Sequence, residues 1–135
     1  MDKYSDRDAR PLALVVDDDP IVRMDVVDML GDLGFRVVDA DCVRDALAYL
    51  EQNGDDVRFL LTDVQMPGNR TGVTLANHVS FIWPHIRILV TSGFRRPADG
   101  TLPVEVQFIA KPLTPNALMA YVATFPSDTV SPSAR

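Results

Sequence analysis

The chain has 135 residues, a formal net charge of -6 and 47% hydrophobic residues, which is the size and composition of one globular domain. Aspartate accounts for 17 of the 19 acidic residues, and the only lysines are Lys3 and Lys111. Without a cluster of Lys and Arg, the chain lacks the basic surface that nucleic-acid binding requires. The single cysteine, Cys42, excludes an internal disulfide, and no apolar run approaches the roughly 18 residues of a membrane span. We therefore expect a cytoplasmic protein that binds neither nucleic acid nor membrane.

The two ends of the chain differ in composition from its middle. Residues 1–10 are polar with mixed charge, and residues 126–135 are rich in Ser, Pro and Thr. Both segments are typical of flexible tails. We expect one folded domain over residues 11–125, with a tail at each end.

The first half of this domain alternates short apolar runs with helical repeats. Leu12 to Val16 and Phe35 to Val38 are rich in Val, Leu and Phe, which predicts strands buried on both faces. Between them, Asp19 predicts the N-cap of a helix that runs from Pro20 until Gly34. Apolar residues at helical spacing predict a second helix from Val43 until Gly54.

The second half continues the alternation. Three further apolar runs predict strands: Arg58 to Thr62, Ile86 to Thr91, and Val106 to Ala110. Helices are expected from Val73 to Ile82 and, after the capping Thr114, from Pro115 to Phe125. Glycines and prolines interrupt residues 92–105, so the fourth of five helices is predicted to be short or irregular.

Repeated alternation of strand and helix predicts an α/β fold, a doubly wound parallel sheet with helices on both faces. In such sheets, ligands bind beyond the carboxyl ends of the strands. The polar residues that follow the strands are Asp17, Asp18 and Asp19, then Asp63, then Thr91 and Ser92, then Lys111. Asp19 already has a structural role as helix cap. We expect Asp17, Asp18 and Asp63 to converge at one edge of the sheet.

Converging carboxylates need a counterion. Two carboxylates roughly 5 Å apart at an effective dielectric constant of about 20 repel each other by about 3 kcal/mol. Ligands that are all oxygen, with room for water, favour Mg²⁺, whereas neither histidine lies at a strand end with the ligand spacing of a zinc site. Lys111 would add a positive charge and Thr91 a hydroxyl, both suited to a phosphoryl group.

Four segments of the sequence carry a resemblance to a known family. They are Val15-Val16-Asp17-Asp18-Asp19-Pro20, Leu61-Thr62-Asp63-Val64-Gln65-Met66-Pro67-Gly68, Val90-Thr91-Ser92-Gly93, and Phe108-Ile109-Ala110-Lys111-Pro112. In this order and at strand ends, they resemble the response regulator receiver domain of two-component signalling. The resemblance covers the whole core and implies a flavodoxin-like five-stranded sheet of order 2-1-3-4-5.

The resemblance also implies a role for each site residue. Asp63 would accept a phosphoryl group, Asp18 and Asp63 would bind Mg²⁺ directly with the backbone carbonyl of Gln65, and Asp17 would hold a metal-bound water. Lys111 would pair with a carboxylate and then with a phosphoryl oxygen, and its peptide bond to Pro112 would be cis. Thr91 and Phe108 would form the switch that responds to phosphorylation. The domain would catalyse only its own phosphorylation and dephosphorylation.

The partners implied are a sensor histidine kinase or a histidine phosphotransfer protein, and a downstream protein that the sequence does not identify. No effector domain follows the core, so we expect a stand-alone receiver, monomeric or weakly dimeric. The loop after Met66-Pro67 is one residue longer than is usual in the family. The alternative is a phosphatase of the haloacid dehalogenase type, which Asp17, Asp19 and Thr91 resemble and in which Asp17 would be the nucleophile. That alternative leaves the segment around Asp63 unexplained.

Overall fold

The computed structural model describes residues 10–66, 71–93, 101–103 and 105–125. The expected tails lie outside these residues except for Arg10, and the longer loop after Met66 lies outside them for the most part. The helix expected within residues 92–105 also falls largely outside. Of its described residues, Ser92 ends β4, Gly93, Thr101 and Leu102 form bends, and Glu105 lies in a turn.

The described residues form a five-stranded parallel sheet. Its strands are β1 (Leu12–Val16), β2 (Arg36–Ala40), β3 (Val57–Asp63), β4 (Arg87–Ser92) and β5 (Gln107–Ala110). They lie in the order β2-β1-β3-β4-β5, and every neighbouring pair is parallel. The predicted strand order is confirmed.

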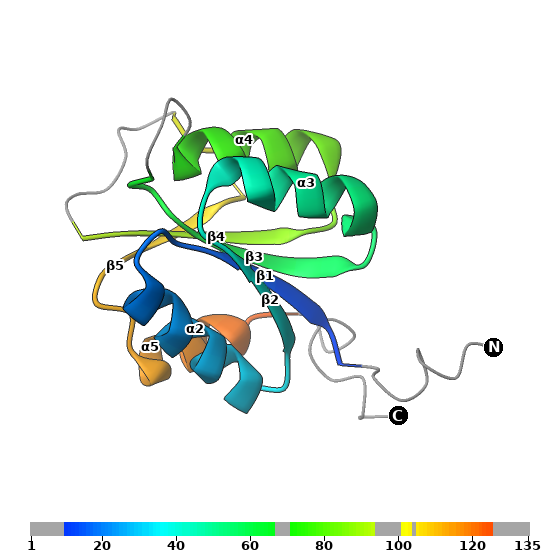
Figure 1. The fold of residues 1–135 in the computed structure, drawn as a ribbon. Helices are drawn as coiled ribbons and strands as arrows, with labels where there is room; N and C mark the ends of the chain where they lie inside the picture. Colours follow the sequence, from blue (N-terminus) through cyan, green and yellow to red (C-terminus); the bar gives the residue numbers. More distant parts are fainter. Residues whose placement is uncertain (1–9, 67–70, 94–100, 104, 126–135) are drawn as a thin grey trace.

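In the described parts of the chain, four helices cover the sheet in two layers, with α3 and α4 on one face and α2 and α5 on the other (Figure 1). They are α2 (Pro20–Asp32), α3 (Val43–Asn53), α4 (Gly72–Ile82) and α5 (Pro115–Val122). Asp19, Thr71 and Thr114 cap three of these helices by accepting hydrogen bonds from backbone N–H groups of the first turn. The caps predicted at Asp19 and Thr114 are confirmed.

The apolar core has two halves, one on each face of the sheet. Alternate residues of a strand point to opposite faces, so each strand contributes to both halves. The cluster beneath α3 and α4 includes Leu14, Val16, Leu60, Leu75, Val79 and Val90. The cluster beneath α2 and α5 includes Val15, Leu30, Phe59, Leu61, Leu89 and Leu118. This alternation decides which side chains reach the functional edge.

Some element boundaries differ from those predicted. Strand β3 includes Asp63, because Asp63 still pairs in register with Thr91 of the neighbouring strand. Strand β2 starts at Arg36, and α5 ends at Val122, where turn residues replace the helix. Gly34 follows α2 with φ of +99°, a backbone conformation that favours glycine and that ends the helix as predicted.

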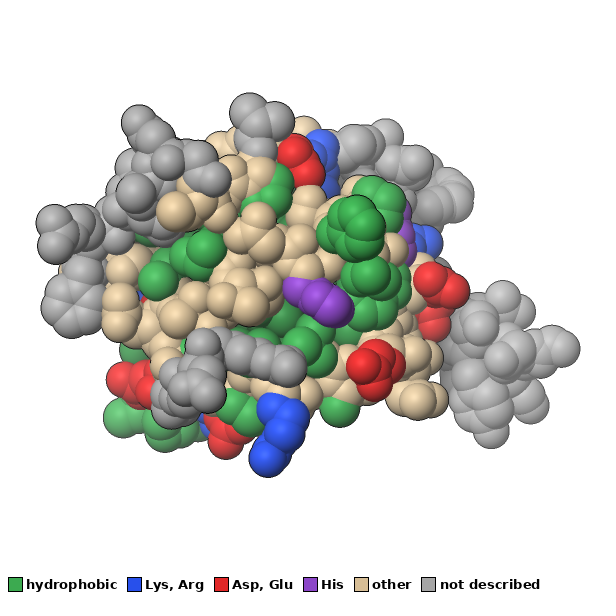
Figure 2. Space-filling view, turned by 90° about the horizontal axis from the view of Figure 1, so that it is seen from above, with side chains coloured by type: hydrophobic (Ala, Val, Ile, Leu, Met, Phe, Trp, Pro, Cys, Tyr) green, Lys and Arg blue, Asp and Glu red, His purple; other side chains and the backbone are tan. Residues whose placement is uncertain are grey.

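The outer face of α3 and α4 carries hydrophobic side chains around a histidine (Figure 2). The most exposed large hydrophobic residue in the described chain is Phe81 of α4, at 84% exposure, and its neighbour Ile82 is also exposed. Within the described part of the chain, every helix falls short of the length and apolar character that crossing a bilayer requires.

Candidate functional site

The candidate site lies at the carboxyl ends of the central strands, on the side of α2 and α5. Val15, Leu61 and Leu89 pack in the core cluster beneath these two helices. Side chains two positions further along a strand point to the same face. The residues at those positions are Asp17, Asp63 and Thr91, and all three are buried. At the carboxyl ends of these three strands, polar side chains therefore take the place of apolar ones on the face beneath α2 and α5.

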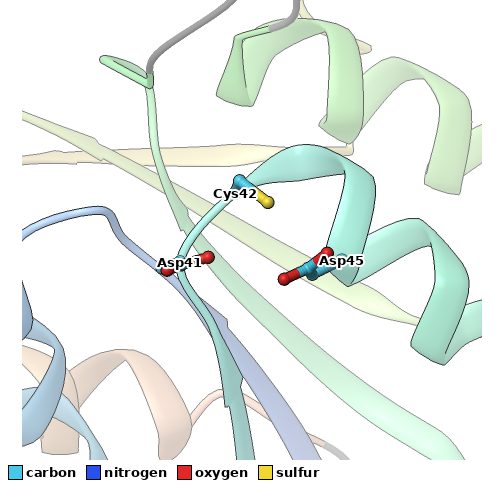
Figure 3. A group of neighbouring side chains, drawn as sticks. All are labelled: Asp41, Cys42 and Asp45. Carbon is cyan, nitrogen blue, oxygen red and sulfur yellow. The ribbon is translucent and has the colours of Figure 1, made fainter.

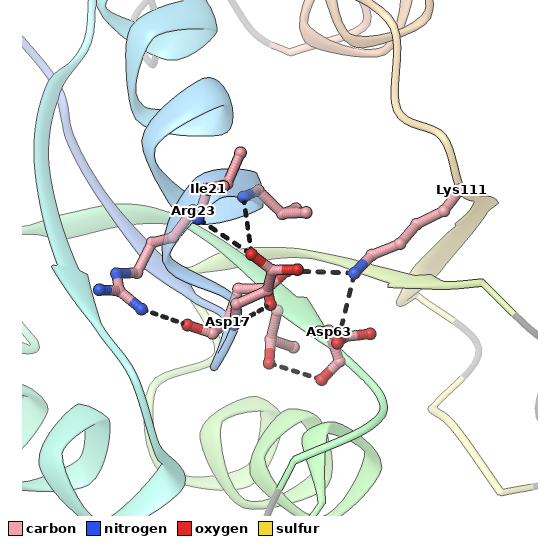
Figure 4. Close-up of polar contacts among 8 residues, drawn as sticks. Asp17, Ile21, Arg23, Asp63 and Lys111 are labelled. Atoms are coloured by element: carbon pink, nitrogen blue, oxygen red, sulfur yellow. Dashed lines mark hydrogen bonds and ion pairs between the residues drawn. The ribbon is translucent and has the colours of Figure 1, made fainter.

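Lys111 joins two of these carboxylates. Its Nζ lies 3.1 Å from Oδ2 of Asp17 and 3.3 Å from Oδ2 of Asp63 (Figure 4). Lys111 follows β5 directly, its backbone N–H donates to the carbonyl of Ser92, and its peptide bond to Pro112 is cis as expected. The predicted convergence of Asp17, Asp63 and Lys111 is thus observed in the geometry.

Asp17 is held firmly by its surroundings. Its Oδ1 accepts the backbone N–H of Asp19 at 2.9 Å, and its Oδ2 accepts from Lys111. Arg23 of α2 donates to the carbonyl oxygen of Asp17 at 2.7 Å and also binds Asp39 at 2.8 Å. Both carboxylate oxygens of Asp17 are therefore occupied.

Asp63 is held mainly through its backbone. It pairs in register with Thr91, and the next N–H, that of Val64, donates to the carbonyl of Thr91 at 2.9 Å. Gly72, the first residue of α4, donates to the carbonyl of Val64, while the hydroxyl of Thr62 donates to the carbonyl of Asp63. These contacts fix the chain on both sides of Asp63 and leave its carboxylate directed at the site.

Burial and charge shift the pKa values of two site residues. Burial raises the pKa of Asp63, the charge of Asp17 raises it further, and the nearby Lys111 ammonium only partly offsets both. For Lys111, burial disfavours the charged form, but the charges and hydrogen bonds of Asp17 and Asp63 outweigh burial and raise its pKa. The site therefore carries more negative charge than one lysine can neutralise.

Asp17, Asp18 and Asp63 form a group that fits a metal ion. Their nearest carboxylate oxygens all lie within 4.8 Å of one another, and Asp18 is exposed to solvent. Oδ1 of Asp63 is buried and has no hydrogen-bond partner among the described residues. A buried carboxylate oxygen without a partner is costly unless a cation or a donor meets it. An all-oxygen group with an open side matches the ligands that Mg²⁺ prefers.

A second group of possible ligands lies at the start of α3, where Asp41, Cys42 and Asp45 meet (Figure 3). Both of its aspartates are exposed, and Cys42 is half-buried. Water can solvate these carboxylates, so the group has no buried charge that a cation must neutralise. The group around Asp63 differs in that two of its three carboxylates are buried.

The structure places the remaining predicted site residues at different depths. Thr91 is 2% exposed and lies between Asp63 and Ile109 in the sheet register. Phe108 is half-buried and packs against the core cluster beneath α3 and α4, on the face opposite Thr91. Gln65 follows β3 by two residues and is exposed.

The sequence model of the response regulator receiver domain family matches residues 13–123. The chain belongs to this family. Receiver domains are signalling domains of two-component systems, and they pair with histidine kinases or phosphotransfer proteins and bind Mg²⁺ at an acidic pocket. The structure has an acidic cluster formed by Asp17, Asp18 and Asp63.

Known receiver proteins resemble the chain over most of its length. The transcriptional regulatory protein AruR of Pseudomonas aeruginosa is 29% identical over 82% of this chain, and the sensor kinase CckA of Brucella abortus is 30% identical over 80%. The chain spans only 47% and 11% of their respective lengths. A crystallised receiver domain from Clostridium thermocellum shares the fold, with a TM-score of 0.75, 21% identity, and coverage of 83% of this chain and 90% of the other.

Four contacts were not predicted from the sequence, two of them at the site. Arg23 donates to the carbonyl of Asp17, and Gly72 lies so close to Asp63 that a Cβ there would overlap the Asp63 carbonyl oxygen. The other two join α4 to the segment before β5, where Asn77 donates to the carbonyl of Thr101 at 2.8 Å and Ser80 donates to Glu105 at 2.6 Å. The glycine at the helix start was the only sequence signal for any of them.

Proposed function

We propose that this receiver domain accepts a phosphoryl group on Asp63 from a phosphohistidine of a sensor kinase or phosphotransfer protein. The observation that carries the proposal is the contrast between two buried carboxylates. Both oxygens of Asp17 accept hydrogen bonds, whereas Oδ1 of Asp63 has no partner in the described chain. Oδ1 of Asp63 is therefore the one oxygen of these two carboxylates with no hydrogen bond from a described residue to compete with bond formation to phosphorus.

The residues around Asp63 would hold the Mg²⁺ ion. We assign Asp18, Asp63 and the backbone carbonyl of Gln65 as direct ligands, and Asp17 as the holder of a metal-bound water. When bound, the ion supplies positive charge that offsets the carboxylates and draws phosphoryl oxygens to the site. The mutual approach of the three aspartate carboxylates supports this assignment.

The phosphoryl transfer requires the protein to form only one covalent bond. An oxygen of Asp63 forms a bond to phosphorus while the bond from phosphorus to the histidine nitrogen breaks, and that nitrogen keeps the electron pair. A loose in-line transfer depends on positioning and charge neutralisation, so no general base is required. Lys111 already lies beside Asp63 and would bind a phosphoryl oxygen once the acyl phosphate has formed.

Phosphorylation would then change the protein surface. The buried hydroxyl of Thr91 lies next to Asp63 in the sheet, where it would donate to the new phosphoryl group. The family resemblance assigns Phe108, which pairs in register with Val90 beside Thr91, as the partner position of the switch. The output would be altered binding to a downstream protein by a cytoplasmic receiver domain that is monomeric or weakly dimeric.

Incubation with acetyl phosphate and Mg²⁺, followed by intact-mass spectrometry, tests the proposal. We expect one added phosphoryl group on the wild type, none on Asp63→Asn, and slower labelling of Asp17→Asn. Asp55→Asn replaces an exposed aspartate that precedes the start of β3, whereas Asp63 ends that strand; it serves as the matched control and should be labelled like the wild type. Labelling that persists in Asp63→Asn and disappears in Asp17→Asn would instead support the phosphatase-type nucleophile.

A further inference from the structure

A cavity of about 320 Å³ lies between α2 and the turn that leads from β5 into α5. Its apolar walls come from Val22, Val26 and Met29 of α2, from Val15 and Leu61 of the sheet, and from Leu113. Asp17 and Lys111 also line it, whereas Asp18 and Asp63 do not. The cavity therefore borders the acidic group at Asp17, whose carboxylate is paired with Lys111.

The size of the cavity suits a small organic molecule. An apolar cavity of roughly 150 Å³ accepts benzene, and most small-molecule sites have volumes of about 300–1,000 Å³. At about 320 Å³, this cavity has room for a bicyclic ring. Its walls are mostly aliphatic, so an apolar ring would replace water there at little polar cost.

The charge around the cavity selects the head group of such a molecule. Lys111 and Asp17 already neutralise each other within the wall. Asp25 of α2 also lines the cavity, is exposed, and forms no side-chain hydrogen bond or ion pair with the described residues. The unmatched charge at the opening is therefore negative, which favours a cationic ligand over an anionic one.

We propose that this cavity is a binding site for a small ring-bearing ammonium ion, with the ring between α2 and Leu113 and the ammonium at Asp25. An occupant would contact Lys111 and Thr91, which also line the cavity. Any effect of the ligand on phosphorylation rests on the proposed function. Binding does not, because it needs neither phosphate nor Mg²⁺.

The binding test uses 1-naphthylmethylamine as the probe and methyl-labelled methionine as the reporter. Met29 lines the cavity, whereas Met24 and Met119 are exposed elsewhere on their helices. In titrations without phosphodonor, we expect a saturable ring-current shift of the Met29 methyl signal and little change at Met119. An unchanged Met29 signal at the solubility limit of the probe would overturn the proposal.

Matched probes and variants test the charge and the cavity separately. 1-Naphthylacetate has a comparable ring with the opposite charge and should bind several-fold more weakly. Asp25→Asn should weaken binding of the amine about threefold, whereas Asp28→Asn, one turn along α2 and outside this cavity, should not. Equal affinity for both probes, or an effect of Asp28→Asn as large as that of Asp25→Asn, contradicts the assignment of the ammonium to Asp25.

Val22→Phe fills the cavity and should abolish the Met29 shift while the circular dichroism spectrum stays that of the folded protein. If that variant fails to fold, Val22→Leu provides the smaller filling and should weaken binding by at least threefold. A folded variant of either kind that binds the amine as the wild type does would place the ligand elsewhere. A failure of Asp63 labelling with acetyl phosphate would leave these binding results unaffected.

Discussion

The backbone of Gly72 packs directly against the carbonyl group of Asp63, and a side chain at position 72 would overlap that carbonyl oxygen. The N–H of Gly72 also donates to the carbonyl of Val64 at 3.0 Å. The start of α4 is thereby packed on the segment that carries the proposed phosphoacceptor. The atoms nearest to such a side chain belong to the backbone of Asp63 and Val64, so they cannot make room by a change of rotamer.

Gly72→Ala should therefore destabilise the protein and disturb the site together. We expect a loss of about 1–3 kcal/mol in the free energy of unfolding, the usual cost of overpacking a well-packed position. Displacement of the chain around Asp63 should also slow labelling by acetyl phosphate. Urea denaturation and intact-mass spectrometry measure the two effects.

Gly31→Ala is the matched control for that prediction. Gly31 lies in α2, is exposed, and has no neighbour within 4 Å of an added Cβ. Replacing glycine by alanine within a helix should stabilise the protein by roughly 0.5–1 kcal/mol. Destabilisation by both variants would show that Gly72 has no special relationship with Asp63.

Asp63→Asn should stabilise the protein at neutral pH in the absence of Mg²⁺. Burial and the charge of Asp17 raise the pKa of Asp63 above its unfolded value, so the folded state holds the proton more tightly than the unfolded state does. The free energy of unfolding therefore falls as the pH rises from the unfolded pKa through the raised folded pKa, and stays lower above it. Asparagine carries no charge and removes this loss.

Thermal denaturation of the wild type and of Asp63→Asn across the acidic pH range tests whether the substitution stabilises the protein as predicted. The difference in melting temperature should be small below pH 4 and should grow in favour of Asp63→Asn toward pH 7. Asp55→Asn, at an exposed position, should show no such growth. A variant less stable than the wild type at pH 7 would mean that the Lys111 contact outweighs the burial of Asp63.

The sequence predicted the fold and the convergence of the site because both depend on short-range patterns. Five apolar runs separated by helical repeats are sufficient to predict a parallel sheet, and polar residues after strands meet at one edge of it. The helix caps at Asp19 and Thr114 followed from the same local signals. The roles assigned to Asp63, Thr91 and Phe108 came instead from the family resemblance and remain predictions.

Long-range packing explains what the sequence did not predict. Asn77 and Ser80 of α4 bind Thr101 and Glu105, residues 24 and 25 positions further along the chain. These hydrogen bonds depend on how α4 packs beside the segment before β5, and no local sequence pattern predicts that packing. The hydrogen bond from Arg23 to the carbonyl of Asp17 likewise depends on the position of Asp39 in β2, because Arg23 also binds the Asp39 carboxylate.

Mg²⁺ should raise the melting temperature of the wild type. At ten times the dissociation constant, a ligand that binds only the folded state adds about 1.4 kcal/mol to the free energy of unfolding. Asp18→Asn should blunt this response, because it removes one carboxylate from the group around Asp63. Differential scanning fluorimetry over a Mg²⁺ titration measures it.

The second acidic group provides the control for the Mg²⁺ response. Asp45→Asn alters the exposed group of Asp41, Cys42 and Asp45 and should leave the response at the wild-type level. A response lost in Asp45→Asn and kept in Asp18→Asn would move the metal site to the start of α3.

Asp19→Ala should remove the cap of α2 and leave the function of the site unchanged. Asp19 caps α2 through Ile21 and Val22, so its loss should cost about 1 kcal/mol of stability. The contact of Asp19 with Asp17 is made by its backbone N–H, which alanine retains. We therefore expect the Mg²⁺ response and Asp63 labelling of Asp19→Ala to match those of the wild type, measured at a temperature where both proteins are folded.

Lys111 should make stability depend on pH in the alkaline range. Because Asp17 and Asp63 raise the pKa of Lys111 above its model-peptide value of 10.5, its stabilising charge is fully present below pH 10.5 and is lost as the pH rises through the folded pKa. Burial raises the pKa of Tyr121 to about 12, and its ionisation adds a loss of stability over the same range in every variant.

Lys111→Arg retains its charge throughout, so its stability should fall less steeply above pH 10.5 than that of the wild type. Lys111→Met should lose about 2 kcal/mol at pH 7 and show the same shallow alkaline slope as Lys111→Arg. Parallel alkaline slopes for wild type and Lys111→Arg in urea denaturation would show that the ammonium contributes nothing to the folded site.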